Sequence, residues 1–160
     1  MRLPAVLLVL ALTTAGCGSE TVAARDRTGA VSSEGAVDAF AVAIGDCVQE
    51  PTDLSEQGEE IESVHAVPCS EPHDGEAYAV FDLPDGDYPG DDEVVAAGEE
   101  RCVEEFADFV GRAYEDSKYD ITSIYPTRSS WEQDGDREYV CLVVAPVGER
   151  VTGSLEGASA

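Results

Sequence analysis

The cysteines constrain the fold of this chain more than any other feature of its sequence. There are five of them, at positions 17, 47, 69, 102 and 141. With the first one used elsewhere, the other four can form two disulfides in an exported protein, and four cysteines allow three connectivities. We favour Cys47–Cys69, across an acidic loop, and Cys102–Cys141, between a predicted helix and a predicted central strand. Each would stabilise a small domain by about 3–4 kcal/mol on the chain-entropy model.

The first cysteine follows an export signal. The chain starts with a positive MR and a short apolar run, VLLVLAL, which is too short to span a bilayer stably. The TTAGC stretch that ends at Cys17 resembles a bacterial lipobox, although Thr14 stands where Leu, Val or Ile is usual. We predict a lipoprotein signal peptide over residues 1–16 and a lipid anchor on Cys17, on the extracytoplasmic side of the cell membrane. The alternative is a secretory signal cleaved near Ala15, which leaves Cys17 as a free thiol.

The charge of the chain is strongly one-sided. It carries 34 acidic and nine basic residues, for a formal net charge of −25. Nucleic acid is excluded as a partner, because its binding depends on Lys and Arg that neutralise phosphates. Electrostatic docking onto anionic lipid is disfavoured for the same reason. We expect a self-repelling, soluble surface, with calcium or a basic partner as the alternatives.

Residues 17–36 predict a flexible tether, because they lack aromatic residues and hydrophobic periodicity. The folded domain is expected over residues 37–157, followed by a frayed end at 158–160. Alternating apolar residues predict strands in the first half of the domain, and an amphipathic helical pattern follows them. The expected elements are strands at 39–44, 61–67 and 76–82 and a helix at 92–110.

More strands are predicted after the helix. A short one is expected at 120–125, and the turn at 134–136 (DGD) predicts a hairpin between strands at 129–133 and 137–145. The run YVCLVV in the last of these indicates a central strand. Together these elements predict an α+β fold with a mainly antiparallel sheet of about five strands, one long helix packed on it and two disulfides.

His73 and the acidic residues are the candidates for chemistry. His73 could be an acid–base group, but a turn residue bonded to a neighbouring backbone group is the favoured interpretation. Cys69 and His73, four positions apart, could begin a zinc site, yet no CxxC pair supplies further ligands. The acidic residues from Asp82 to Asp92 could gather calcium, but their spacing is not that of an EF-hand. A solvated loop is the simpler interpretation, and we expect no metal and no cofactor.

Trp131 is the only tryptophan and lies just before the predicted hairpin turn. Together with Arg137 and His73 it forms our candidate binding surface. The alternative for Trp131 is packing in the core or on a face of the sheet.

Several motifs, taken in order, resemble the septum formation domain of actinobacteria. They are GDCV at 45–48, VPCS and PHD within 67–74, YPG at 88–90, the helix cysteine at 102, YPT at 125–127, GDR and VCL within 135–142, and TGSL at 152–155. The resemblance covers about residues 40–157. It implies an extracytoplasmic domain that is held by lipid or by a membrane helix and is associated with septum formation, and it carries over no catalytic residue.

The sequence therefore favours a lipid-anchored, non-enzymatic protein that binds or scaffolds an envelope or division protein. A cell-envelope hydrolase that uses acidic residues or His73 is the alternative. It predicts a deep cleft that holds a carboxylate with a raised pKa. A calcium-stabilised adhesion module is a third possibility, because a bound ion would stabilise the native state.

Overall fold

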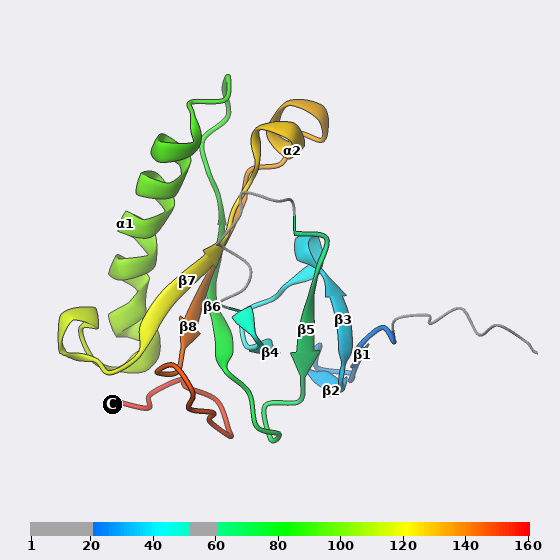
Figure 1. The fold of residues 1–160 in the computed structure, drawn as a ribbon, viewed down its shortest axis with the longest axis vertical. Helices are drawn as coiled ribbons and strands as arrows, with labels where there is room; N and C mark the ends of the chain where they lie inside the picture. The colour runs from blue at the N-terminus through cyan, green and yellow to red at the C-terminus, as the bar shows by residue number, and fades with distance from the viewer. Residues whose placement is uncertain (1–20, 52–60) are drawn as a thin grey trace, which may run out of the picture.

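The computed structural model of the protein describes residues 21–51 and 61–160 (Figure 1). Its main sheet has six antiparallel strands in the order β3-β5-β4-β6-β8-β7, and a second sheet has two strands. The strands are β1 (Ala24–Arg25), β2 (Val31–Ser33), β3 (Gly35–Asp38), β4 (Cys47–Gln49), β5 (Ser63–Val67), β6 (Gly75–Asp82), β7 (Asp120–Ile124) and β8 (Glu138–Val144). The predicted α+β class is confirmed, with one strand more than expected in the main sheet and a small sheet in addition.

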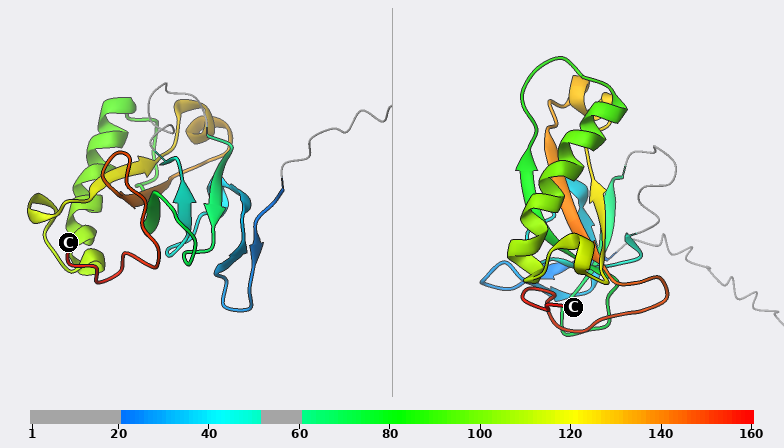
Figure 2. Two further views of the ribbon diagram at one scale, coloured as in Figure 1. Left: turned by 60° about the horizontal axis from the view of Figure 1, so that its bottom comes forward. Right: turned by 90° about the vertical axis from the view of Figure 1, so that its left-hand side faces the viewer.

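The long helix α1 (Asp91–Val110) covers one face of the main sheet (Figures 1 and 2). Acidic residues fill its first turn, where the helix dipole is positive, and Gly111 ends it in a left-handed conformation with φ of 80°. Every fourth residue faces the sheet. The buried row is Val94, Gly98, Cys102, Phe106 and Val110. The predicted helix is confirmed, although one of its valines, Val103, is exposed and does not join the buried row.

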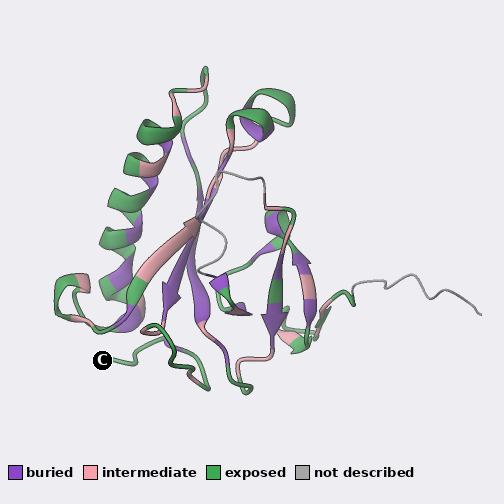
Figure 3. Cartoon of the chain, in the orientation of Figure 1, coloured by how far each residue is buried: buried purple, intermediate pink, exposed green. Residues whose placement is uncertain are grey.

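Both faces of the main sheet are buried. Figure 3 shows the buried side of α1 turned toward the sheet, and the core between them is built around Phe106 and Tyr139. On the other face, Val37 of β3 and Val64 of β5 share a second core with Leu142 of β8. Strands near opposite edges can share a core only if the sheet curls, so this sheet closes partly on itself.

A bulge in β6 changes which of its side chains share a face. The register against β8 shifts between Ala77 and Ala79, so Tyr78 and Ala79 both enter the core under α1. A strictly alternating strand would place Tyr78 and Ala79 on opposite faces, so the alternation predicted for the strand at 76–82 breaks at the bulge. The bulge lets the Tyr78 hydroxyl donate a hydrogen bond to the carbonyl oxygen of Cys102 at 2.7 Å, and burial raises the pKa of Tyr78.

The strand predicted at 39–44 is wrong. Residues Ala39–Ala41 form one turn of 3-10 helix, capped by the Asp38 carboxylate, which accepts from the N–H of Phe40 at 2.9 Å. Phe40 and Ile44 are 56% and 60% exposed. The alternating apolar residues therefore belong to a connection, and the strand that pairs with β5 lies just before it, as β3.

Residues 21–36, predicted as part of the tether, are built into the fold. The N–H of Ala23 donates to the carbonyl oxygen of Ala36 at 2.9 Å, and β1 pairs with β2. Arg25 adds a two-pronged ion pair, in which its guanidinium donates to the two carboxylate oxygens of Asp46 at 2.6 and 2.7 Å. Asp46 is buried, so removal of Arg25 would leave an uncompensated charge. These contacts order the segment, and no hydrophobic periodicity in the sequence predicts them.

Helix α2 (Arg128–Gln133) replaces the strand predicted at 129–133. A capping box starts it: the Thr127 hydroxyl accepts from the N–H of Ser130, and the Ser130 hydroxyl accepts from the N–H of Thr127, both at 3.1 Å. Ser130 also donates to the Asp136 carboxylate at 2.9 Å. The DGD turn therefore follows a short helix, and the predicted hairpin is wrong.

The C-terminal residues pack against the end of α1. The N–H of Ser159 donates to the carbonyl oxygen of Val110, and the Ser159 carbonyl accepts from Arg112, both at 2.8 Å. The end predicted to fray at 158–160 is thus held in place. Within the described ranges, no helix has both the length and the apolar character that a membrane crossing requires.

Candidate functional site

Two disulfides join the elements as the sequence predicts. Cys47 of β4 is bonded to Cys69, which follows β5, with Cα atoms 5.2 Å apart. Cys102 of α1 is bonded to Cys141 of β8, with Cα atoms 5.6 Å apart. The second bond ties the helix to an inner strand of the sheet. Every cysteine in the described part of the chain is therefore paired.

The candidate binding surface lies where α2 meets the loop between β6 and α1. Trp131 is only 5% exposed, and its indole N–H donates to the carbonyl oxygen of Gly86 at 2.9 Å. Tyr88 packs edge-on against it, with ring centroids 5.6 Å apart. These contacts leave a hollow of about 530 Å³, which we call the Trp131 recess. It is lined by Gly86, Asp87, Tyr88, Arg128, Trp131, Glu132 and Arg137.

Two arginines stack on the rings of the Trp131 recess. The Arg137 guanidinium lies 3.8 Å from the centroid of the Trp131 ring, and that of Arg128 lies 4.6 Å from the centroid of the Tyr88 ring. Arg137 also donates to the carbonyl oxygen of Trp131 at 3.1 Å. Its Nε is buried without a hydrogen-bond partner among the described residues, and the Asp85 carboxylate, 3.8 Å away, is too far to accept.

The surroundings of the Trp131 recess keep Tyr88 neutral. Burial, the hydrogen bond from its hydroxyl to Asp91 and the charge of that carboxylate raise the pKa of Tyr88 to about 12. Trp131 also lines a second, more apolar hollow of about 330 Å³, between the same loop and the start of α1, to which Leu83 and Val94 contribute. The Trp131 recess therefore presents guanidinium groups and aromatic rings, and the second, more apolar hollow lies next to it.

His73, the third residue of the predicted surface, lies apart from the other two. His73 lies just before the start of β6, whereas Arg137 lies at the other end of that strand. There the backbone carbonyl oxygen of Arg137 accepts from the N–H of Leu83, which follows β6, at 2.8 Å. His73 is 0% exposed, and its Nδ1 lies 2.9 Å from the carbonyl oxygen of Glu71. The structure thus agrees with the turn interpretation of His73, and its ring is closed to a substrate in this conformation.

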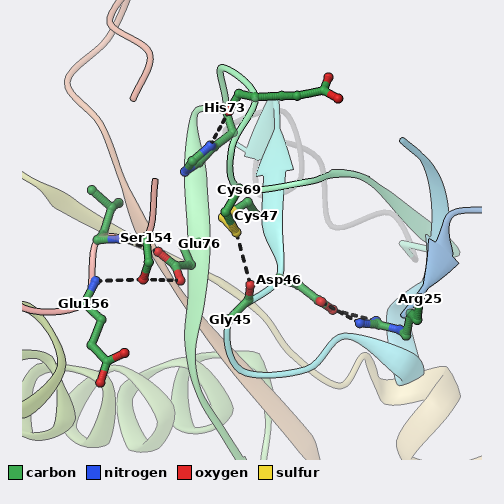
Figure 4. The surroundings of a disulfide bond; sticks show 11 residues. Arg25, Gly45, Asp46, Cys47, Cys69, His73, Glu76, Ser154 and Glu156 are labelled. Carbon is green, nitrogen blue, oxygen red and sulfur yellow. Dashed lines mark hydrogen bonds and ion pairs between the residues drawn. A yellow bond between two sulfur atoms is a disulfide. The ribbon is translucent and has the colours of Figure 1, made fainter. Parts of the chain in front are cut away.

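Glu76 is a buried carboxylate that no motif in the sequence marks. It accepts from the Ser154 hydroxyl at 2.8 Å and from the N–H of Leu155 at 2.5 Å, which holds the segment after β8 against β6 (Figure 4). One ligand atom each from Glu76, His73 and Cys47 lie within 4.8 Å of one another. The only hint in the sequence is the position of Glu76 at the start of an otherwise apolar strand, EAYAVF.

The acidic residues between Asp82 and Asp92 do not converge. In the described ranges, the group at Cys47 is the only one that brings three metal-ligating side chains within 4.8 Å of one another. Another carboxyl group, that of Glu138, has its pKa raised by burial and then by the charges of Asp136 and Asp82, but Glu138 lines neither hollow beside Trp131. Cys17 and the predicted signal peptide lie outside the described residues.

Comparison with known proteins gave one match. A protein-family model described as "Septum formation" matches residues 13–117 and 45–159. No curated protein and no solved structure matches the chain. The matched ranges contain both disulfides, the Trp131 recess and Glu76.

Proposed function

Since this chain belongs to the septum formation family, we propose that it is a lipid-anchored protein on the extracytoplasmic face of the cell membrane. It takes part in septum formation by binding an envelope or division protein and not by catalysis. Cys17 carries the lipid, and the Trp131 recess is the contact surface.

The stacked arginines support the binding role. The chain has nine basic and 34 acidic residues, yet two of its arginines line one recess. Guanidinium groups positioned over aromatic rings are preorganised to bind carboxylates. Trp and Arg are also the residues that most often dominate binding energy. The partner is therefore a protein that inserts an acidic side chain into the recess.

Arg128→Ala tests the recess with little risk to the core, because Arg128 is exposed and its ion pair with Glu132 is a surface contact. We expect partner affinity to fall at least about tenfold, since a charge-assisted hydrogen bond contributes about 1.5–3 kcal/mol. Arg101→Ala is the matched control. Arg101 also stacks on a ring, 4.1 Å from the centroid of Phe81, and also pairs at i,i+4, but it does not line the recess.

Site-specific photo-crosslinking supplies the measurement. A photoreactive residue at Glu132, on the recess, is compared in dividing cells with one at Val147, which is 100% exposed and follows the opposite end of β8. We expect a crosslinked protein that is specific to position 132, weakened by Arg128→Ala and unaffected by Arg101→Ala. Equal crosslinking at the two positions, or equal effects of the two arginine variants, would refute the recess as the contact surface.

The lipid anchor is tested by intact mass of the protein extracted from membranes. We expect a chain that begins at Cys17 with a diacylglycerol or triacyl increment on that residue, and four thiols that appear only after reduction. Cys17→Ala should remove the increment and leave the four other cysteines unchanged. A chain cleaved near Ala15 with an unmodified Cys17 would refute the anchor and leave the proposed recess untouched.

A further inference from the structure

His73 carries a buried nitrogen that no neighbouring group uses. Nδ1 lies 2.9 Å from the carbonyl oxygen of Glu71, and since a carbonyl oxygen only accepts, Nδ1 carries the proton and donates to it. Nε2 of the neutral ring is then an acceptor with a free lone pair. It has no hydrogen-bond partner among the described residues, although the side chain is fully buried. Buried acceptors are nearly always paired, so this nitrogen is available to bind a ligand or an ion.

Two more ligand-type groups surround the His73 ring. Glu76 of β6 and Cys47 of β4 are also buried, and one ligand atom from each of the three residues lies within 4.8 Å of the others (Figure 4). The two Glu76 oxygens each accept one hydrogen bond, from Ser154 and Leu155, and each keeps a second lone pair. Ligands that are oriented from behind by backbone or side-chain partners are typical of metal sites.

The Cys47–Cys69 disulfide decides whether this cluster can bind a metal. As long as Cys47 is bonded to Cys69, its sulfur is not a thiolate and is not available as a ligand. We propose that reduction of this disulfide converts the cluster into a Zn²⁺ site, with Cys47, His73 and Glu76 as ligands and Cys69 as the fourth. This redox-controlled site is separate from the binding role of the Trp131 recess and does not depend on it.

The donor set and its geometry suit zinc. Two thiolates, a neutral imidazole and a carboxylate are all ordinary zinc ligands, and a tetrahedral site places such atoms about 3.5 Å apart. The atoms of Cys47, His73 and Glu76 already lie within 4.8 Å of one another, so these three ligands need shifts of about 1 Å. Cys69 lies outside this group and has to move toward it once the bond to Cys47 is broken. Because Glu76 also holds Ser154 and Leu155, metal binding would act directly on the segment that packs against β6.

Reduction requires two electrons, which a dithiol supplies. One thiolate of the dithiol attacks Sγ of Cys69, which is partly exposed, and expels Cys47 as a thiolate beside His73. The second thiol of the dithiol then attacks the mixed disulfide, releases Cys69 and leaves the dithiol oxidised to a disulfide. The two thiol protons pass to solvent when Zn²⁺ binds both thiolates. Cys102 and Cys141 are both fully buried, so a dithiol reaches Cys47–Cys69 first.

Cobalt titration tests the site, because Co²⁺ bound by thiolates has charge-transfer absorption that other ligands do not give. The exported protein is titrated without oxygen, both oxidised and after reduction with dithiothreitol and removal of the reagent. We expect the reduced protein to bind one Co²⁺ per chain with thiolate charge-transfer and tetrahedral d–d bands, and Zn²⁺ to displace it. The oxidised protein should show neither band. A reduced protein without a thiolate band would overturn the proposal.

Two histidine variants separate this site from binding by cysteine thiols alone. His65 is the only other histidine and lies exposed on β5, so His65→Gln is the matched control. His73→Gln should weaken Co²⁺ binding at least about tenfold, and His65→Gln should leave it unchanged. Glu76→Gln is a second ligand variant with the same expected loss. Circular dichroism identifies any variant that is unfolded. If one ligand variant is unfolded, the cobalt affinity of the other ligand variant tests the site. Wild-type affinity in both ligand variants would show that thiols alone hold the cobalt.

Discussion

Replacement of both Cys102 and Cys141 by alanine should lower the free energy of unfolding by about 3–4 kcal/mol, the loop-closure term for cysteines 39 positions apart. Both sulfur atoms lie in the fully buried core between α1 and the sheet, so the lost packing adds to this loss. Urea unfolding, followed by circular dichroism and analysed by linear extrapolation, measures the change.

The matched control is the double alanine variant of Cys47 and Cys69. These cysteines are 22 positions apart, so their loop-closure term is smaller by about 0.5 kcal/mol. Cys69 is also partly exposed, whereas both cysteines of the helix pair are buried, which reduces the packing loss of the control. A helix-pair variant that is more stable than the control would contradict the inference that Cys102–Cys141 holds α1 on the sheet.

Gly98→Ala should destabilise the protein although alanine is the better helix former. A Cβ at this position would overlap the ring of Tyr139, which is fully buried and stacks against the rings of Phe81 and Tyr125. Overpacking of this kind costs about 1–3 kcal/mol and occasionally more. The gain in helix propensity over glycine is only about 1 kcal/mol, so we expect a net loss and a lower Tm.

Glu100→Ala is the control for helix propensity, because Glu100 lies exposed on α1, two positions from Gly98. It should change the free energy of unfolding by no more than about 0.5 kcal/mol. Thermal unfolding of the two variants next to wild type compares them directly. A Tm for Gly98→Ala equal to or above that of wild type would mean that Tyr139 can give way, and that the close approach of α1 to β8 is not needed for stability.

The parts of the fold that could be predicted are those with a local pattern. Helix α1 is visible in its apolar spacing and in Gly111, which supplies the left-handed end. The pairing of Cys102 with Cys141 follows from an apolar stripe that must face a central strand. In each case, the helix and the strand are recognisable from residues that are close together in the sequence, and the long-range packing agrees with these local preferences.

The parts that were missed depend on contacts between distant residues or on a single cap. Arg25 finds its partner Asp46 21 positions away, and nothing in the sequence near Arg25 predicts that pair. The alternating run after Asp38 has the period of a strand, but the Asp38 carboxylate stabilises a 3-10 turn in its place. Thr127 starts α2 through a capping box whose second member is Ser130 and not the more usual Glu or Gln.

The candidate sites show the same limit. Trp131 and Arg137 could be named together because they lie six positions apart, and the structure stacks them. The position of His73 relative to Trp131 and Arg137 could not be predicted. Sequence spacing does not show whether two distant residues will lie at the same end of a strand. Glu76 was hidden because the chain has 34 acidic residues, and burial, which distinguishes Glu76 from most of them, is decided by the tertiary fold.

The folded N-terminal segment sets the height of the domain above the bilayer. Ala23 is already hydrogen-bonded to Ala36, and only six positions separate it from Cys17. With the lipid on Cys17 as proposed, a fully extended chain of that length spans at most about 20 Å. Figure 1 places β1 and β2 at the lower right and α2 at the top. The folded domain would therefore begin within about 20 Å of the headgroups, with the Trp131 recess at the end of the domain away from the attachment point. The size of the domain, and not the length of a linker, would determine which layer of the envelope the recess can reach.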